Sequence, residues 1–376
     1  MIGFLVAGAM ATSVIAAPAG PWTAQDSRLI GRSLARPPVA CAVDGVTAAG
    51  GRVTGAKFYR QMIGFAQAAK TDGGLHRKLL VVSRADDTPG KGETGSLRWA
   101  VTQAAAAGGG WIAFAPGLRG ATIRLRAPLR LASNITIDGG CVMPRLVGAG
   151  RGSILYVRGS HNIVVSRLQL EQAGGGGDGD CITVSHGADR IWLAYLRLRH
   201  CRDGLIDVTR DKVAGPMRVT ISNNRFTDHD KAMLVVGSPL PPPCRTLQDP
   251  IRLTVARNIF YRTGQRHPRA SGDALVHLQD NVIAFAPRKR ADGQGGAYGT
   301  LAADGAHIKV ERTLYIPPAG GRSYRLMADQ AGPAGEADGP CRRGYIDRTG
   351  ADPGSSRVMR DRFIRAIIRM TDPPVD

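Results

Sequence analysis

Short alternating runs of hydrophobic and polar residues follow one another through most of this chain. A signature made of an aliphatic residue, any residue and a second aliphatic residue begins at seven positions, whose starts lie 28, 28, 28, 34, 23 and 32 residues apart. Those positions are Ile135, Ile163, Ile191, Val219, Leu253, Val276 and Ile308. Because the spacing recurs while the loops vary in length, the pattern predicts an array of equivalent structural units.

Each unit holds two or three short alternating strands separated by Gly, Asn and Asp, with no helical pattern between them. Such strands cannot bury their inner face alone, so the units must stack coil on coil with their aliphatic side chains inward. The predicted fold is therefore all-β, a right-handed parallel β-helix. An ordinary antiparallel sandwich is the alternative, but it would show turn signals every ~8–12 residues and no long period.

Asparagine recurs at one phase of the repeat, just before an apolar residue, at Asn224, Asn258 and Asn281. Asn tolerates left-handed backbone, and its amide can bond to the same residue in the next unit. The sequence therefore predicts an asparagine ladder at a turn of the solenoid.

The ends of the array have different patterns. Leu79–Val82 predicts a strand, and Glu93–Ala107 predicts a helix, opened by Thr94 or Ser96, that caps the open N-terminal end. Before it, Phe58–Lys70 is the one plausible helix. Residues 317–354 are Pro/Gly-rich and are expected to wrap the solenoid. Ser356 is expected to begin a last helix, with one face formed by Met359, Phe363, Ile367 and Met370.

Residues 1–19 form an apolar run that ends in Ala17-Pro18-Ala19 and lacks a basic N-terminal region. This run predicts a signal peptide and a secreted or periplasmic protein, and no other stretch is long and apolar enough to span a bilayer. Residues 20–376 then form a single, monomeric domain, with a solenoid core over about 79–315 and a C-terminal wrapping segment over 316–376.

The six cysteines form an even set, which an exported protein can use for disulfides. Their pairing cannot be read from the sequence. Cys181 and Cys201 lie close to one solenoid turn apart and could stack on one another.

Positive charge dominates the composition. The chain has 50 Lys and Arg against 30 Asp and Glu, a formal net charge of +20, which attracts polyanions. An Arg-rich composition without a binding role is the alternative. Nucleic-acid binding calls for aromatic residues among the basic ones, and aromatic residues make up only 5% of the chain. The expected partner is therefore an acidic polysaccharide rather than nucleic acid.

Four acids cluster in two consecutive units: Asp178 and Asp180 in one, Asp203 and Asp207 in the next. Asp180 and Asp203 are 23 residues apart, about one coil, so stacking can place them on one face. Carboxylates crowded in this way favour a hard divalent cation such as Ca²⁺. Acids that bond their own turn backbone are the alternative interpretation.

Two cations follow in later units, Lys231 in TISNNRFTDHDKAML and Arg266 in RTGQRHPRAS. Either residue alone could be solvated surface charge. Beside an acid cluster, both make sense if the ligand is an acidic sugar whose carboxylates bridge a metal ion and a cationic side chain.

Five ordered motifs carry a resemblance to a known family: SLRWAV at 96–101, SNITIDG at 133–139, DGLIDVT at 203–209, VTISNNRFTDHDKAML at 219–234 and QRHPR at 265–269. Over roughly residues 79–285 the chain resembles the pectate lyase family of polysaccharide lyases. The resemblance implies a right-handed parallel β-helix, Ca²⁺, and β-elimination of polygalacturonate to unsaturated oligogalacturonides.

The resemblance also implies roles for individual residues. The calcium carboxylates of the family fall on Asp180, Asp203 and Asp207, with Asp178 as an accessory ligand. The lysine that holds a substrate carboxylate falls on Lys231. The arginine that removes the C5 proton falls on Arg266, with Pro268 in place; because a guanidinium is ordinarily protonated, this base role comes from the resemblance alone.

The sequence departs from the family pattern at two places. The second arginine of the Arg-x-Pro-x-x-Arg motif falls on Ser271, and Arg269 is the residue that could replace it in binding substrate. The family's Trp-Ile-Asp-His stretch is Trp192-Leu193-Ala194-Tyr195, a change expected to affect packing and hydrogen bonding near the groove. A catalytically inactive or retuned β-helix protein that binds acidic polysaccharide is therefore the alternative function.

Overall fold

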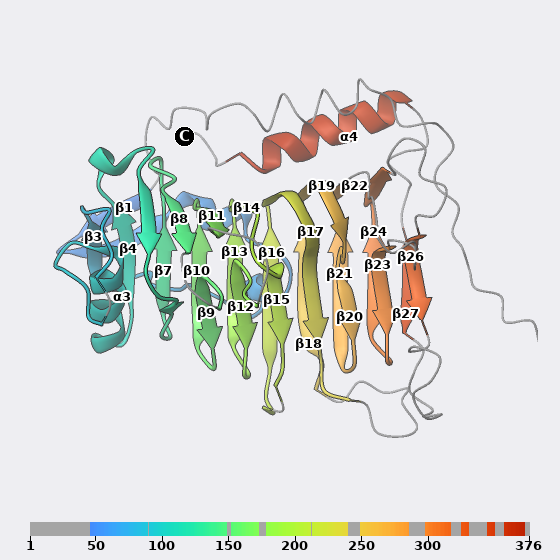
Figure 1. Cartoon of the computed structure of the whole chain (residues 1–376), viewed down its shortest axis with the longest axis horizontal. Helices are drawn as coiled ribbons and strands as arrows, with labels where there is room; N and C mark the ends of the chain where they lie inside the picture. The colour runs from blue at the N-terminus through green and yellow to red at the C-terminus, as the bar shows by residue number, and fades with distance from the viewer. Residues whose placement is uncertain are drawn as a thin grey trace, which may run out of the picture.

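The chain winds into stacked coils along the long axis of the molecule, and the coils contribute strands to parallel sheets (Figure 1). The computed structural model describes residues 46–88, 90–148, 152–172, 178–211, 213–239, 249–285, 298–316, 325–330, 344–349 and 357–372. Within these residues, the predicted all-β, right-handed parallel β-helix with an N-terminal capping helix is confirmed. Residues 1–19, where a signal peptide is expected, lie outside them.

One ten-stranded sheet holds all seven repeat signatures in a single register row, so that Ile135, Ile163 and Ile191 pair in succession and Val219, Leu253, Val276 and Ile308 continue the row. The repeat phase read from the sequence is therefore the hydrogen-bonding register. The strands of this sheet are β3 (Leu79–Val82), β4 (Gly110–Phe114), β7 (Ile135–Asp138), β10 (His161–Ser166), β13 (Asp189–Ala194), β16 (Met217–Ser222), β18 (Ile251–Ala256), β21 (Ala274–Gln279), β24 (His307–Glu311) and β27 (Tyr345–Thr349).

The remaining solenoid strands form two rows. Row A comprises β5 (Thr122–Leu125), β8 (Arg145–Gly148), β11 (Gln169–Gln172), β14 (Arg197–Arg199), the start of β17 (Arg225–Val236), β19 (Ile259–Gln265), β22 (Val282–Phe285) and β25 (Leu314–Ile316). Row B comprises β6 (Leu129–Arg130), β9 (Leu155–Arg158), β12 (Ile182–Ser185), β15 (Gly204–Thr209), the end of β17, β20 (Arg269–Ser271), β23 (Tyr298–Ala303) and β26 (Arg325–Gln330). The long strand β17 joins the rows because its first residues pair with β14 and its last residues pair with β15.

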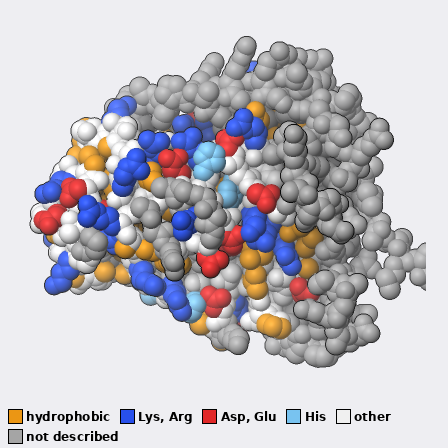
Figure 2. Space-filling model, in the orientation of Figure 1, with side chains coloured by type: hydrophobic (Ala, Val, Ile, Leu, Met, Phe, Trp, Pro, Cys, Tyr) orange, Lys and Arg blue, Asp and Glu red, His pale blue; other side chains and the backbone are white. Residues whose placement is uncertain are grey.

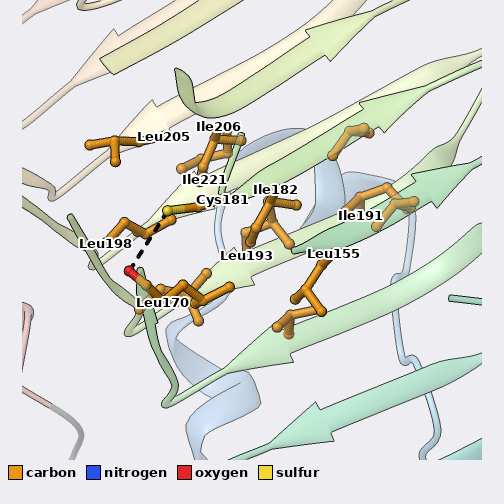
Figure 3. Close-up of a cluster of buried hydrophobic side chains, with 14 of the residues drawn as sticks. Leu155, Leu170, Cys181, Ile182, Ile191, Leu193, Leu198, Leu205, Ile206 and Ile221 are labelled. Atoms are coloured by element: carbon orange, nitrogen blue, oxygen red, sulfur yellow. Dashed lines mark hydrogen bonds between the residues drawn. The ribbon is translucent and has the colours of Figure 1, made fainter. Parts of the chain in front are cut away.

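Aliphatic side chains from all three faces fill the centre of the coil, as Figure 3 shows for one layer around Ile182, Ile191 and Ile206. These side chains are completely buried. Burial of each such side chain stabilises the fold by about 1.5–3 kcal/mol, so the inward alternation of every strand supports the stack.

The predicted asparagine ladder is confirmed. The amide of Asn224 donates to Oδ1 of Asn258 at 3.0 Å, and the amide of Asn258 donates to Oδ1 of Asn281 at 3.1 Å. All three side chains are buried. The ladder pairs polar groups at a turn where water cannot reach them.

The capping helix α3 (Leu97–Ala106) closes the N-terminal end and buries Leu97, Ala100 and Ala104 against the core. It begins later than the expected Glu93, because Gly95 adopts a φ of 86° that a helix does not allow. Ser96 is the N-cap, and its hydroxyl accepts a bond of 3.2 Å from the Trp99 N–H.

The expected helix over Phe58–Lys70 is wrong as a continuous element. A 3₁₀ helix η1 (Lys57–Gln61) and a short α2 (Gly64–Ala68) replace it, with a break at Gly64, whose φ is 65°. A side chain at Gly64 would also meet Thr254 at 2.2 Å. A hairpin of β1 (Val46–Ala49) and β2 (Arg52–Ala56) precedes η1, and another 3₁₀ turn, η2 (Pro116–Leu118), lies further along the chain.

The N-terminal segment packs against the outer face of the ten-stranded sheet, and this corrects the expected place of the Trp192 stretch. The Trp192 ring lies 5.6 Å from the Phe58 ring, and its Nε1 donates to Ser222 Oγ at 2.9 Å. Trp192 belongs to β13, outside row B. Its neighbours therefore support the attachment of the N-terminal segment, and not a groove.

The last helix, α4 (Arg357–Met370), runs along β19, β22 and β25 of row A (Figure 1). Its buried side chains are Ile364, Ile367 and Ile368, whereas Met359 and Met370 are 46% and 41% exposed. The expected face of Met359, Phe363, Ile367 and Met370 is thus partly wrong, because the buried stripe follows the i, i+3, i+4 spacing from Ile364. The expected N-cap, Ser356, lies outside the described residues.

Two strands, β26 and β27, fall inside the stretch expected to wrap the solenoid, and they extend row B and the ten-stranded sheet. None of the helices in the described part of the chain combines the length and hydropathy that a membrane span requires.

Candidate active site

Three acidic side chains meet at the beginning of two neighbouring strands of row B. Asp180 lies two residues before β12, Asp203 directly precedes β15, and Asp207 lies within β15. One carboxylate oxygen of each lies within 4.8 Å of those of the other two. Because β12 and β15 pair in parallel, consecutive coils carry the three acids to one place.

Hydrogen bonds from the backbone and from hydroxyl groups fix two of these carboxylates. Asp180 accepts bonds from the Gly204 N–H at 2.8 Å and from Thr183 Oγ1 at 2.7 Å. Asp207 accepts a bond of 3.0 Å from the Leu234 N–H. A side chain at Gly204 would lie 2.4 Å from Asp207 Oδ1, so glycine at this position allows the acids to converge.

Burial raises the pKa of Asp207 well above its usual range, and the neighbouring charge of Asp180 adds to the effect. The Leu234 N–H and the Arg266 charge oppose it. The pKa of Asp180 is also raised, again mainly by burial. Proximity and burial thus disfavour the ionised forms of both groups, and a bound cation would restore them. Three carboxylates are hard oxygen ligands, so the donor set fits Ca²⁺.

A disulfide joins the two turns that carry these acids. Cys181 follows Asp180, Cys201 precedes Asp203 by two residues, and the two cysteines are bonded with their Cα atoms 5.5 Å apart. Cys181 points into the core, where its sulfur lies 3.7 Å from the Leu170 carbonyl oxygen (Figure 3). The Asp203 N–H also donates to Gly179 O at 2.9 Å. The two turns are therefore held together by a covalent bond and by backbone bonds.

Lys231 lies in the middle of β17, in register with Gly204 of β15 and Gln265 of β19. Its Nζ forms an ion pair with Asp203 Oδ1. The Lys231 and Asp203 side chains remain 36% and 34% exposed. This cation therefore compensates the least buried acid of the cluster and can still reach a ligand from solvent.

Arg266 occupies the junction between β19 and β20, with a left-handed φ of 63°. Its carbonyl accepts a bond of 2.9 Å from the Met233 N–H, which anchors the junction to β17. The side chain is half-buried, and its Nε has no hydrogen-bond partner among the described residues. His267, the next residue, is fully buried between Phe260 and Phe285 and bonds to Thr263 Oγ1 at 2.7 Å.

The other predicted site residues lie at different distances from the acids. Arg269 pairs with Leu234, which pairs with Asp207, so Arg269 lies in the same outward row two strands away, about 10 Å at the usual strand spacing. Ser271 lies two residues further along β20. Asp178 is exposed and does not belong to the group of converging carboxylates.

The sequence motifs did not predict three residues of the site. His229 donates from Nε2 to the Asp203 carbonyl oxygen at 2.7 Å, and burial lowers its pKa. Ser153 accepts a bond of 3.0 Å from the Asp180 N–H. Arg202, next to Asp203, has a buried Nε without a partner in the described structure. The alternation of side chains along β17 could have identified His229, because it places His229 on the same face as Lys231.

The space-filling view shows acidic side chains next to basic and histidine side chains in the middle of the described surface (Figure 2). The fold and this cluster define a parallel β-helix protein with a candidate divalent-cation site, flanked by a lysine and an arginine from the following coils.

Comparison with known proteins gives the family resemblance. The chain is 31% identical over 255 residues to probable pectate lyase P56 of Solanum lycopersicum, which covers 63% of this chain and 59% of the relative. It is 32% identical over 236 residues to pectate lyase 1 of Chamaecyparis obtusa, which covers 58% of each chain. The chain thus spans less than two thirds of these curated relatives. No protein-family model matches it.

The crystal structure of jun a 1, the major allergen from cedar pollen, superimposes with a TM-score of 0.50 at 23% identity, over 78% of this chain and 77% of that one. This similarity supports the fold. The curated relatives confirm the resemblance to the pectate lyase family that the sequence motifs indicated.

Proposed function

We propose that this protein is a secreted or periplasmic polysaccharide lyase of the pectate lyase type, acting as a monomer on polygalacturonate. The observation that carries the proposal is the convergence of three carboxylates within 4.8 Å, next to Lys231 and Arg266. The names of the curated relatives supply the reaction and substrate class. Export rests on the apolar residues 1–19.

The residues that would hold a calcium ion are Asp180, Asp203 and Asp207, with Asp178 available as an accessory ligand from the exposed turn. Bound calcium would withdraw charge from a uronate carboxylate and so acidify the neighbouring C5–H. The raised pKa of Asp180 and Asp207 supports this assignment, because a bound cation stabilises the ionised carboxylates that burial and, to a smaller extent, repulsion disfavour.

Lys231 is suited to hold the substrate carboxylate. Its ammonium group already pairs with a carboxylate, Asp203, and is partly exposed. A uronate that takes the place of Asp203 as the partner of Lys231 would meet a cation where negative charge grows as the C5 proton leaves. Such a group stabilises the transition state more than the ground state.

Arg266 is suited to remove the C5 proton. In anti β-elimination, the proton passes to the base, the C5–H electron pair forms the C4–C5 double bond, and the C4–O4 bond breaks. The departing O4 then takes a proton from water. The arginine side chain accepts a proton only when its guanidine group is neutral. The proposal therefore expects activity to rise toward alkaline pH.

The alternative is a β-helix protein that binds acidic polysaccharide without cleaving it. The serine at position 271 favours this alternative, because the family motif has a cationic arginine at that position. Arg269 faces the same outward row as Asp207 and would supply the replacement in the lyase.

An ultraviolet assay separates the two functions, because only elimination creates a conjugated unsaturated uronide. We expect polygalacturonate to give rising absorbance in calcium and none in a chelator, and Asp203→Asn to need more calcium for the same rate. Methylated pectin and other uronans in parallel assays define the substrate. Binding of polygalacturonate without any absorbance change would leave the non-catalytic alternative.

A further inference from the structure

A second cationic feature lies on the outer face of row A, apart from the candidate active site. It is a pocket of about 350 Å³ across β8, β11, β14, β17 and β19. We call it the arginine pocket. Its lining residues include Arg145, Arg197, Arg199, Arg225, Arg262, Glu171, Asp228 and Tyr261.

The arginine pocket lies on the earlier coils of row A, next to the coils that α4 covers. Along one outward row of paired residues, Arg197 and Arg225 are followed by Ile259, and then by Val282 and Leu314. The apolar part of this row lies under α4. The arginines begin where the helix ends, and Asp372, just past the helix, pairs with Arg225. The change from apolar to cationic side chains therefore follows the edge of the helix.

The five arginines outnumber the acids that line the pocket. Glu171 pairs with Arg145 at 3.3 Å and with Arg199 at 2.7 Å, and Asp228 pairs with Arg262. The lining residues alone hold five cations and two anions, an excess of three (5 − 2), and Asp372 beside the pocket neutralises one of these, so that two positive charges remain.

Within the described chain, Arg197 is the arginine of the pocket that has a buried nitrogen without a hydrogen bond. Its Nη2 is buried and has no hydrogen-bond partner among the described residues. Burial also lowers its pKa. A carboxylate from a ligand would supply the missing partner, because guanidinium groups bind carboxylates through two parallel bonds.

The pocket is adjacent to the candidate active site along three successive coils. Arg199 precedes Asp203 by four residues, Thr227 precedes Lys231 by four, and Arg262 precedes Arg266 by four. Four residues of extended chain span at most about 14 Å. Tyr261 adds an aromatic ring to the wall, with the Arg262 guanidinium 5.7 Å from the ring centre. A sugar ring has an apolar face that can pack on such a ring.

We propose that the arginine pocket binds a second uronate segment of the acidic polysaccharide, outside the candidate active site. The substrate class in this inference rests on the proposed function. One polymer that occupies both places gains affinity through effective concentration, whereas a digalacturonate can occupy only one. The pocket therefore favours long chains.

The test compares variants by calorimetric titration with polygalacturonate and with digalacturonate, in calcium and in the Arg266→Lys background, so that the candidate active site can bind without cleavage. Arg199→Glu reverses a charge on a side chain that is 47% exposed, so the fold should tolerate it. Arg197→Gln removes the unsatisfied guanidinium. Arg119→Glu, at the exposed residue that follows η2, is the charge-matched control.

We expect Arg199→Glu and Arg197→Gln to weaken polygalacturonate binding about tenfold or more, with digalacturonate binding and the control unchanged. Equal polymer affinity in Arg199→Glu and Arg119→Glu would overturn the proposal. Loss of single-stranded DNA binding with intact polygalacturonate binding would also overturn it, in favour of a nucleic-acid site. Both readouts are binding, so absence of lyase activity would refute the proposed function without deciding the role of the pocket.

Discussion

Arg266 is the residue on which the proposed reaction depends most. We predict that Arg266→Lys lowers kcat by about two to four orders of magnitude and leaves KM nearly unchanged, because lysine keeps the charge but cannot place a base at the same point. Lys231→Ala should change both kcat and KM, since its carboxylate contact exists before and during the reaction. Steady-state kinetics on polygalacturonate measures both. Near-normal kcat in Arg266→Lys would move the base to another residue, with Arg269 the first to test.

His267, beside Arg266, makes the stability of the protein depend on pH. Burial lowers its pKa from 6.5 to about 3 in the folded state. Below pH 6.5 the unfolded chain therefore binds a proton that the folded chain excludes. We predict that folding stability contributed by this group is complete above pH 6.5 and falls by about 1.4 kcal/mol per pH unit as the pH drops toward 3.

Urea denaturation midpoints at several pH values measure this effect. His267→Met should remove that part of the pH slope, and the exposed His161→Gln should retain it. An unchanged slope in His267→Met would show that other groups carry the acid sensitivity.

At the residue scale, the spacing of the sequence anticipates the meeting of Asp180 and Asp203, because one coil separates them. It does not anticipate His229, whose partner is a backbone carbonyl on the previous coil. Nor does it reveal that Cys181 and Cys201 pair with each other, because an even count of cysteines allows many pairings. Contacts between side chain and backbone across coils leave little trace in a residue pattern.

The disulfide works at the scale of the turns, since it joins the turn of Asp180 to the turn of Asp203. We predict that Cys181→Ser with Cys201→Ser weakens calcium binding about tenfold or more, because the acids are then less preorganised. The fold should also lose about 3 kcal/mol, as expected for a cross-link that closes a loop of this length. Calorimetric titration with calcium and urea denaturation measure the two effects.

Calcium affinity equal to that of the parent protein would contradict the role of this disulfide in the site. Ile206→Val, a small core change in the same coil, gives a matched control for stability loss without the cross-link. It should cost about 0.5–1.5 kcal/mol and leave calcium affinity intact.

Helix α4 stabilises the outer face of row A through a buried stripe that its sequence only partly suggested. We predict that Ile367→Ala destabilises the protein by about 2–5 kcal/mol, because the side chain is buried and leaves a cavity. Met359→Ala, at a 46% exposed position of the same helix, should have little effect. Thermal unfolding compares the two, and equal losses would show that α4 does not pack as described.

At the scale of elements, the strand phase is predictable because every coil repeats the same inward alternation. Helix boundaries are less predictable, because single glycines determine them. Gly95 delays the start of α3, and Gly64 divides the expected helix over Phe58–Lys70. The face of α4 depends on the row A strands it meets. A helical pattern with apolar residues on more than one side does not identify that face by itself.

The whole molecule combines a rigid solenoid with an excess of positive charge. Stacked parallel strands fix the acids, Lys231 and Arg266 on successive coils, and the arginine pocket lies on the same coils. A net charge of +20 attracts a polyanion at long range, and the arginine pocket gives that attraction a location. In the proposed function, an acidic polymer would therefore bind to an extended surface around one candidate reactive site.

The mass of the products made in heavy-oxygen water tests the central claim of calcium-dependent elimination most directly. Elimination cleaves the polymer without adding water, so the account predicts unsaturated oligogalacturonides that lack the label, formed with calcium, lost in chelator and lost in Arg266→Lys. Saturated products that carry the heavy oxygen would identify hydrolysis and contradict the account, as would intact polymer after incubation of the folded, calcium-loaded protein.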